Sequence, residues 1–242
     1  MKKILTVLLF LAPLFVFADI QIQKADEYYN KGRFDLALKE YKSALNGRQN
    51  NAYLYYNIGN SYFKLGSLGR ALAYYDKAFE LNPRDSFIRQ NFSFALERSG
   101  QSLVPPGLPE VLHKVFFFLS KSELRGLFFI TVWLFLTAFS YFLLKRKGKK
   151  VLYITAALCL LSGIWYGFTW YGSNYERAVI VDFAGQLRSG PGDGFEISAT
   201  LPEGYFVSVE DVKDDWVLIK PVQQNAISGW INEENIIKID NI

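Results

Sequence analysis

The sequence predicts a multi-domain membrane protein that combines an α-helical solenoid, two transmembrane helices and a small all-β barrel. Three observations carry this prediction. Residues 52–85 hold a pattern of small and aromatic residues that recurs, more weakly, in the segment before them. Residues 126–144 and 151–171 are long apolar runs without a charged residue. Beyond residue 177 the chain changes to short alternating runs separated by turn residues.

The formal net charge of +4 is spread unevenly along the 242 residues. Residues 101–171 carry 8 basic and 2 acidic residues, a net of +6, whereas residues 172–242 carry 5 and 12, a net of −7. Positive charge therefore accompanies the apolar runs and forms no basic face on a folded domain, so we expect no nucleic-acid partner. One cysteine and one histidine leave no disulfide pair and no usual metal site, and we expect no cofactor.

The first 18 residues have the features of a secretory signal peptide. Two lysines precede an apolar run over residues 4–17, and Val16 and Ala18 occupy the −3 and −1 positions of a cleavage site before Asp19. An uncleaved anchor is the alternative. Either form places the residues that follow outside the cytoplasm.

The pattern in residues 52–85 has the offsets of a helical hairpin. Gly59 and Ala71 let two helices cross closely, and aromatic residues fill the space between neighbouring turns. The segment resembles the tetratricopeptide repeat (TPR) family, and residues 19–51 are similar in the same register. The resemblance implies a TPR domain over 19–100, with repeats at about 19–51 and 52–85 and a solvating cap helix at 86–98. The positions that carry it are Tyr55, Ile58, Gly59, Tyr62, Ala71, Tyr75 and Pro83.

Members of this family usually bind a peptide or a protein in the concave groove lined by the first helix of each hairpin. The alternative for the tyrosines among the groove positions is packing inside the domain. The carboxylate clamp that some members use for chaperone peptides is absent, because Ile22, Asp26, Phe87 and Asn91 do not fit its pattern. By resemblance, the groove-facing residues of this chain are Asp26, Tyr29, Tyr53, Tyr56, Asn60, Phe63 and Lys64.

Residues 101–122 begin as a Pro-rich linker and continue into a helix that we expect to lie at the membrane interface ahead of the first span. The single histidine, His113, is expected to be an exposed side chain and not a ligand. The apolar face of this helix is formed by Leu112, Val115, Phe116 and Leu119.

The two uncharged runs are long enough to span a bilayer. At about 1.5 Å per residue, residues 126–144 and 151–171 each cover about 30 Å, and a buried globular helix is the alternative. Residues 145–150 between them hold five lysine and arginine side chains, each costing about 2.5 to 3.5 kcal/mol at the centre of a bilayer. These residues therefore form a turn, and positive charge in a short loop favours the cytoplasm. The sequence predicts a hairpin in the bacterial cytoplasmic (inner) membrane, with both end domains extracytoplasmic or periplasmic.

Residues 177–240 alternate between apolar and polar positions as a small β barrel does. Segments 187–191 (LRSGP), 201–204 (LPEG), 216–219 (WVLI) and 229–231 (GWI) resemble the bacterial SH3 domain. Some relatives bind cell-wall peptides and others pack against partner proteins. The two tryptophans can equally belong to the barrel core. The expected SH3-like surface consists of Tyr205, Phe206, Trp216 and Trp230.

The order of these segments resembles the tetratricopeptide member of the Bacteroides aerotolerance (Bat) operon family. The resemblance implies a non-enzymatic, membrane-anchored scaffold of the cell envelope, working in a stress or aerotolerance complex beside membrane-bound von Willebrand A proteins and a MoxR-type ATPase. A peptidoglycan-binding module that acts through the SH3-like domain is the alternative. Enzymatic activity is not expected, since the sequence shows no nucleophile–base pair and no metal-ligand spacing.

Overall fold

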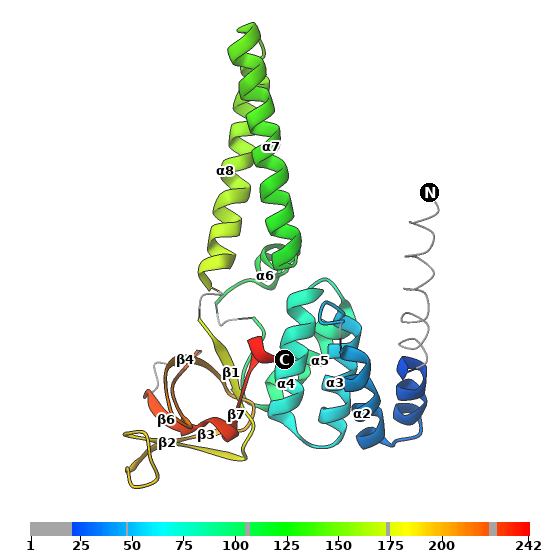
Figure 1. The fold of residues 1–242 in the computed structure, drawn as a ribbon, viewed down its shortest axis with the longest axis vertical. Coiled ribbons are helices and arrows are strands. Elements are labelled where there is room, and N and C mark those ends of the chain that lie inside the picture. Colours follow the sequence, from blue (N-terminus) through cyan, green and yellow to red (C-terminus); the bar gives the residue numbers. More distant parts are fainter. Residues whose placement is uncertain (1–20, 47, 105–106, 173–174, 223–226) are drawn as a thin grey trace, which may run out of the picture.

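The protein has a helical unit and a β barrel that lie side by side at the base of a long helical hairpin (Figure 1). The computed structural model describes residues 21–46, 48–104, 107–172, 175–222 and 227–242. The predicted fold class is confirmed, because paired helices, two membrane-length helices and an antiparallel barrel are all present. The predicted signal peptide, residues 1–18, lies outside the described residues.

The helical unit stacks antiparallel helices that cross closely. The helices over residues 52–64 and 68–81 can approach closely only because residue 59 is glycine. A Cβ atom at Gly59 would lie 2.7 Å from Cδ1 of Tyr75. Side-chain caps start two of the helices: Asn51 and Asp85 each accept hydrogen bonds from two backbone N–H groups of the first turn. The helices are one over residues 21–30, then α2 (Phe34–Leu45), α3 (Ala52–Lys64), α4 (Leu68–Leu81) and α5 (Ser86–Arg98).

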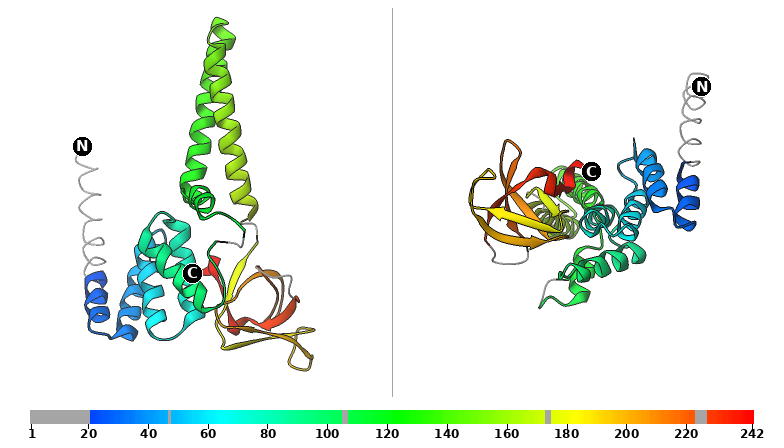
Figure 2. Two further views of the ribbon diagram at one scale, coloured as in Figure 1. Left: turned by 180° about the vertical axis from the view of Figure 1, so that it is seen from behind. Right: turned by 90° about the horizontal axis from the view of Figure 1, so that it is seen from below.

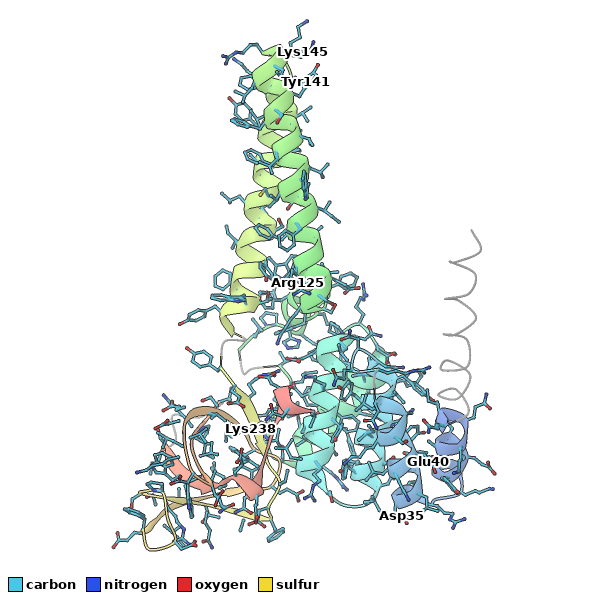
Figure 3. All side chains as sticks on the ribbon, viewed as in Figure 1. Asp35, Glu40, Arg125, Tyr141, Lys145 and Lys238 are labelled. Carbon is cyan, nitrogen blue, oxygen red and sulfur yellow. The ribbon has the colours of Figure 1, made fainter. Side chains whose placement is uncertain are left out.

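The hairpin consists of α7 (Lys121–Lys145) and α8 (Lys149–Gly172), preceded by the short helix α6 (Glu110–Phe116). Both long helices are apolar and long enough to cross a membrane, with mean hydropathies of 2.2 and 1.8. They pack through a hydroxyl pair, Thr131 and Ser162, whose oxygens lie 2.7 Å apart. Figure 3 shows Lys145 at the far tip and Arg125 near the base, where the other units lie.

The barrel is one seven-stranded antiparallel sheet with strand order β3-β2-β6-β5-β4-β1-β7. Side chains alternate between its two faces, so Ala178 and Ile180 of the first strand enter the barrel core while Val179 points away from it. The strands are β1 (Arg177–Ile180), β2 (Ala184–Arg188), β3 (Ile197–Pro202), β4 (Phe206–Lys213), β5 (Trp216–Pro221), β6 (Gly229–Asn232) and β7 (Ile236–Lys238).

The barrel and the helical unit lie side by side, as Figure 2 shows from two further sides, and they share a hydrophobic core. Val179, Phe206 and Ile239 of the barrel belong to the same buried cluster as the inner residues of α4 and α5. The ring of Phe206 lies 6.1 Å from that of Phe92 on α5. The helix over 86–98, expected to be a solvating cap, packs its inner face on α4 and meets the barrel through Phe92, while Phe87 and Phe94 on its other side are exposed.

Polar contacts complete this interface at the start of α4. Its N-cap residue, Ser67, makes no side-chain cap, and Glu203 of the barrel accepts the hydrogen bond of the Gly69 N–H at 2.8 Å. A carboxylate is favourable there because the N-terminus of a helix carries partial positive charge. Gln101 of the linker bonds two backbone groups of the barrel: it donates to the Gly204 carbonyl at 2.7 Å and accepts from the Phe206 N–H at 3.1 Å.

The close approach of α4 to β1 makes Gly69→Ala a test of this interface. A Cβ atom at Gly69 would lie 2.2 Å from the carbonyl oxygen of Ile180, so the two units must separate. We expect the variant to lose about 1 to 3 kcal/mol of stability, the usual range for overpacking, and its Tm to fall by several degrees. Thermal unfolding of the full chain measures this. Gly194→Ala is the control, because a Cβ atom there meets nothing within 4 Å. Equal effects of the two substitutions would contradict the interface.

Candidate protein-binding surfaces

The concave face of the helical unit carries the residues predicted to bind a partner. Asp26 and Tyr29 lie on the helix over 21–30 and the other five lie on α3. Tyr53 is 47% exposed, and Lys64 is also exposed. The side chains of Tyr29, Tyr56, Asn60 and Phe63 are half-buried, so each presents only part of its surface to a partner.

Asp26 acts within this face as an anchor for two tyrosines. Its carboxylate accepts hydrogen bonds from the hydroxyls of Tyr41 at 2.5 Å and Tyr53 at 3.0 Å. Burial, together with the bond to Asp26, raises the pKa of Tyr41, so its hydroxyl stays protonated and donates. The Tyr53 ring is thereby held in place at the open side of the face, which lowers the entropy that binding would cost.

An amide network extends the face onto α5. Asn60 accepts hydrogen bonds from the Tyr75 hydroxyl at 2.7 Å and from the Asn91 amide at 3.0 Å, and Asn91 also donates to the Tyr56 hydroxyl at 2.8 Å. Asn91 was considered only for the carboxylate clamp and was not included among the residues predicted to face the groove. The repeat itself contained the signal, because Asn91 stands one 34-residue period after Asn57.

The groove ends against the barrel. The Arg98 guanidinium lies 5.3 Å from the ring centre of Phe63 and 5.6 Å from that of Phe94, and both rings can hold a cation. Beside them is a cavity of about 350 Å³, here called the groove-end cavity, whose lining includes Phe63, Arg98 and the barrel residue Glu203. The concave face thus continues onto the barrel. Neither Phe94 nor Arg98 was predicted from the sequence.

The structure places the four residues of the predicted SH3-like surface in different environments. Phe206 is only 9% exposed and packs on α5, so assigning it to an exposed surface is wrong. Tyr205 is half-buried and packs against the barrel core. Trp216 and Trp230 alternate with buried core residues along β5 and β6, which places both rings on the outer face and excludes them from the core.

Arg188 joins this outer aromatic face. Its guanidinium lies 5.9 Å from the ring centre of Trp216, and it faces Trp230 in the strand register. It also donates hydrogen bonds of 2.8 Å to the carbonyls of Asp193 and Phe195, which fixes the Gly-rich loop between β2 and β3. The outer face of the barrel therefore presents two tryptophans and a fixed arginine.

His113 on α6 is buried, and the expectation that it is exposed is wrong. It is 3% exposed, and its ring lies 4.6 Å from the ring of Phe117. Its Nδ1 atom is 2.8 Å from Nη2 of Arg89 on α5. Because a guanidinium only donates, Nδ1 accepts and the imidazole is neutral. Burial, with the charge of Arg89, lowers the pKa of His113.

An ionic junction joins the three parts of the molecule. Arg177 at the start of β1 pairs with Asp76 and Glu80 of α4, and Lys121 at the start of α7 lies 2.6 Å from Glu80. Burial raises the pKa of Asp76 to about 6. Burial also acts to raise the pKa of Glu80, but the charges of Arg177 and Lys121 outweigh it and the pKa is lowered.

Family comparisons identify the two folded units. Residues 25–66 match a TPR repeat model and residues 52–85 match a tetratricopeptide repeat model, while residues 184–238 match the bacterial SH3 domain. The chain therefore contains tetratricopeptide repeats and a bacterial SH3 domain, which indicates a role in protein interaction. No curated protein matches the sequence at a significant level.

Similar solved structures include a mutant of MamA, which is 18% identical, with a TM-score of 0.33 over 35% of this chain and 61% of that one. Another is the first TPR of Spaghetti (RPAP3) bound to an HSP90 peptide, which is 24% identical, with a TM-score of 0.31 over 34% of this chain and 68% of that one. The chain thus spans about three fifths of the length of the MamA structure.

The buried histidine predicts a pH dependence of stability. The folded-state pKa of His113 lies below its ordinary value of about 6.5, so the unfolded chain binds the proton first as pH falls. Its contribution is therefore present above about pH 6.5 and is lost below it. We expect the Tm to fall more between pH 7.5 and pH 5.5 for the natural protein than for His113→Gln.

Comparing the natural protein with His113→Gln isolates the contribution of His113 to the change in Tm. Asp76 acts in the opposite sense, because its raised pKa contributes stability that is lost as pH rises through about 6, but it is present in both proteins. Arg89 and Glu110, the charged groups that act on His113, are also unchanged. Equal losses of Tm in the two proteins would contradict the burial of a neutral imidazole.

Proposed function

We propose that this protein is a non-enzymatic, membrane-anchored scaffold of the bacterial cell envelope. The observation that carries the proposal is the continuity of the concave face with the barrel at Phe63, Arg98 and Glu203. The face offers tyrosine rings and amides that are held in place by internal hydrogen bonds. Such groups suit recognition of an extended segment of another protein, since rigid aromatic side chains bind at low entropic cost.

We infer that the partners belong to one envelope complex. The order of the segments supports von Willebrand A membrane proteins and a MoxR-type ATPase as partners, in a complex that serves aerotolerance or another stress response. A scaffold held on the same membrane meets such partners at a high effective concentration, so each contact can be individually weak.

Photo-crosslinking in intact cells tests the groove. A photoreactive amino acid at Tyr53, which is exposed on the concave face, is expected to capture von Willebrand A membrane proteins. The same amino acid at Lys39, exposed on α2, is the matched control and is expected to capture them at least tenfold less. Equal capture from both positions, or capture of cytosolic chaperones from Tyr53, would contradict the proposal.

We place the hairpin across the cytoplasmic membrane, with the turn after α7 inside and both folded units outside. The uncharged lengths of α7 and α8 and the basic turn support this orientation. The test uses Cys159→Ser with one new cysteine, either Glu210→Cys on the barrel or Lys147→Cys in the turn. A membrane-impermeant maleimide is expected to label position 210 in spheroplasts and position 147 only after permeabilisation. The reverse pattern would exclude this topology.

Peptidoglycan binding is the second candidate function, favoured by the outer face with Trp216, Trp230 and Arg188. It predicts that the protein is retained on purified murein and that Trp216→Ala abolishes most of the retention. Phe183→Ala is the control, because Phe183 is 88% exposed in the connection between β1 and β2 and lies outside this face. If the unmodified protein is not retained, peptidoglycan binding is ruled out.

A further inference from the structure

A cavity of about 310 Å³, here called the interfacial cavity, lies where the base of the hairpin meets the helical unit. One wall comes from Lys121, Ser122 and Arg125 of α7. These three residues share one side of that helix, because Arg125 follows the other two by three and four positions. The last two turns of α8 and the end of α4 form the other walls. None of the binding surfaces described above includes this cavity.

Arg125 brings a positive charge to the interfacial cavity that the fold itself does not use. Its side chain is exposed, and it forms no hydrogen bond or ion pair with another residue that the structure describes. The one carboxylate in the lining belongs to Glu80, which already bonds Lys121 at 2.6 Å and also pairs with Arg177. The lining therefore has an excess of positive charge, which favours an anion.

The hydrogen-bond donors of the lining suit a phosphate group. The guanidinium of Arg125 can bind two phosphate oxygens at once. An ammonium group has three N–H donors, so Lys121, which bonds Glu80 and is 49% exposed, has donors left for a ligand. The exposed Ser122 hydroxyl and Asn50 amide complete the set. A tetrahedral phosphate can accept from donors in several directions, whereas a planar carboxylate has only two oxygens for them.

The interfacial cavity lies at the boundary of the apolar part of the hairpin. Arg125 is the last charged residue before the uncharged run of 126–144, and Figure 3 shows it near the base of the hairpin. Tyr166 and Trp170 line the cavity from the end of the other uncharged run. Rings of these two types favour the headgroup level of a membrane. If the hairpin spans the bilayer, as proposed above, the cavity opens at the depth of lipid phosphate groups.

From these observations we propose that the interfacial cavity binds the headgroup of an anionic phospholipid of the phosphatidylglycerol type. Arg125 holds the phosphate, Lys121 and Ser122 donate to its remaining oxygens, and the acyl chains run along the apolar surface of the hairpin. A zwitterionic headgroup fits less well, because its ammonium group would find only Glu80, which two cations already bind. This inference rests on the membrane placement in the proposed function.

Photolabelling of the full chain in phosphatidylcholine nanodiscs tests the proposal. A phosphatidylglycerol probe and a phosphatidylcholine probe carry the same diazirine in their acyl chains, close to the glycerol. We expect the phosphatidylglycerol probe to label residues 121–130 and 162–172 about tenfold more strongly, the ratio typical of a hydrogen bond to a charged group. In Arg125→Gln the two probes are expected to label these segments equally. The substitution leaves folding intact, because the Arg125 side chain is exposed and makes no contact of this kind within the described chain.

Lys114→Gln is the matched control. It removes the same charge from an exposed side chain of α6, the helix that precedes the hairpin, and Lys114 lies outside the lining. The preference for the phosphatidylglycerol probe is expected to be unchanged in this variant. Millimolar inorganic phosphate distinguishes a lipid from a free anion. A preference that survives added phosphate supports the lipid, and a preference that phosphate abolishes overturns it.

Two further outcomes separate this proposal from the membrane placement. Equal labelling of the natural protein by the two probes overturns the lipid site and leaves the membrane placement standing, as does an equal loss of preference in Arg125→Gln and Lys114→Gln. Absence of label from α7 and α8 with both probes overturns the membrane placement and the lipid site together.

Discussion

The packing of β1 against α4 is the contact on which the rest of the structure depends. It joins the two folded units, so Val179, Phe206 and Ile239 of the barrel are buried in the same cluster as the inner residues of α4 and α5. Both faces of β1 are consequently buried, one by the barrel core and one by the helical unit. A strand with two buried faces needs apolar side chains on both faces. The strand β1 reads Arg-Ala-Val-Ile, and its one charged residue, Arg177, forms an ion pair with α4.

The polar groups at this interface set the geometry more than they raise the stability. Buried ion pairs lose about as much in desolvation as they gain in attraction, so Arg177 with Asp76 and Glu80 contributes little net free energy. A misaligned interface, however, would leave these charges buried without partners, which is costly. The same holds for Glu203 at the start of α4 and for Gln101 against the barrel backbone. These contacts therefore select one arrangement of the units.

A fixed arrangement changes how the binding surfaces work. Two modules on flexible tethers would gain avidity from effective concentration alone. Here the groove and the barrel belong to one packed body, so a partner segment bound as proposed and leaving the concave face at Arg98 would meet the barrel in a set position. Preorganisation of this kind lowers the entropy lost on binding. It also makes Phe206 unavailable to a partner, because this residue packs against α5.

Local patterns in the sequence determined the repeats, the two long helices, the basic turn and the barrel, since period, length and turn residues act over short distances. The repeat period also contained the position of Asn91. Alternation along β4, β5 and β6 showed that neighbouring side chains face opposite ways, but it did not show which face a second unit would cover. Only the tertiary structure decided that Phe206 and His113 are buried, that Trp216 and Trp230 are outside the core, and that Glu203 caps α4. These outcomes depend on contacts between residues more than 20 positions apart, which no local pattern encodes.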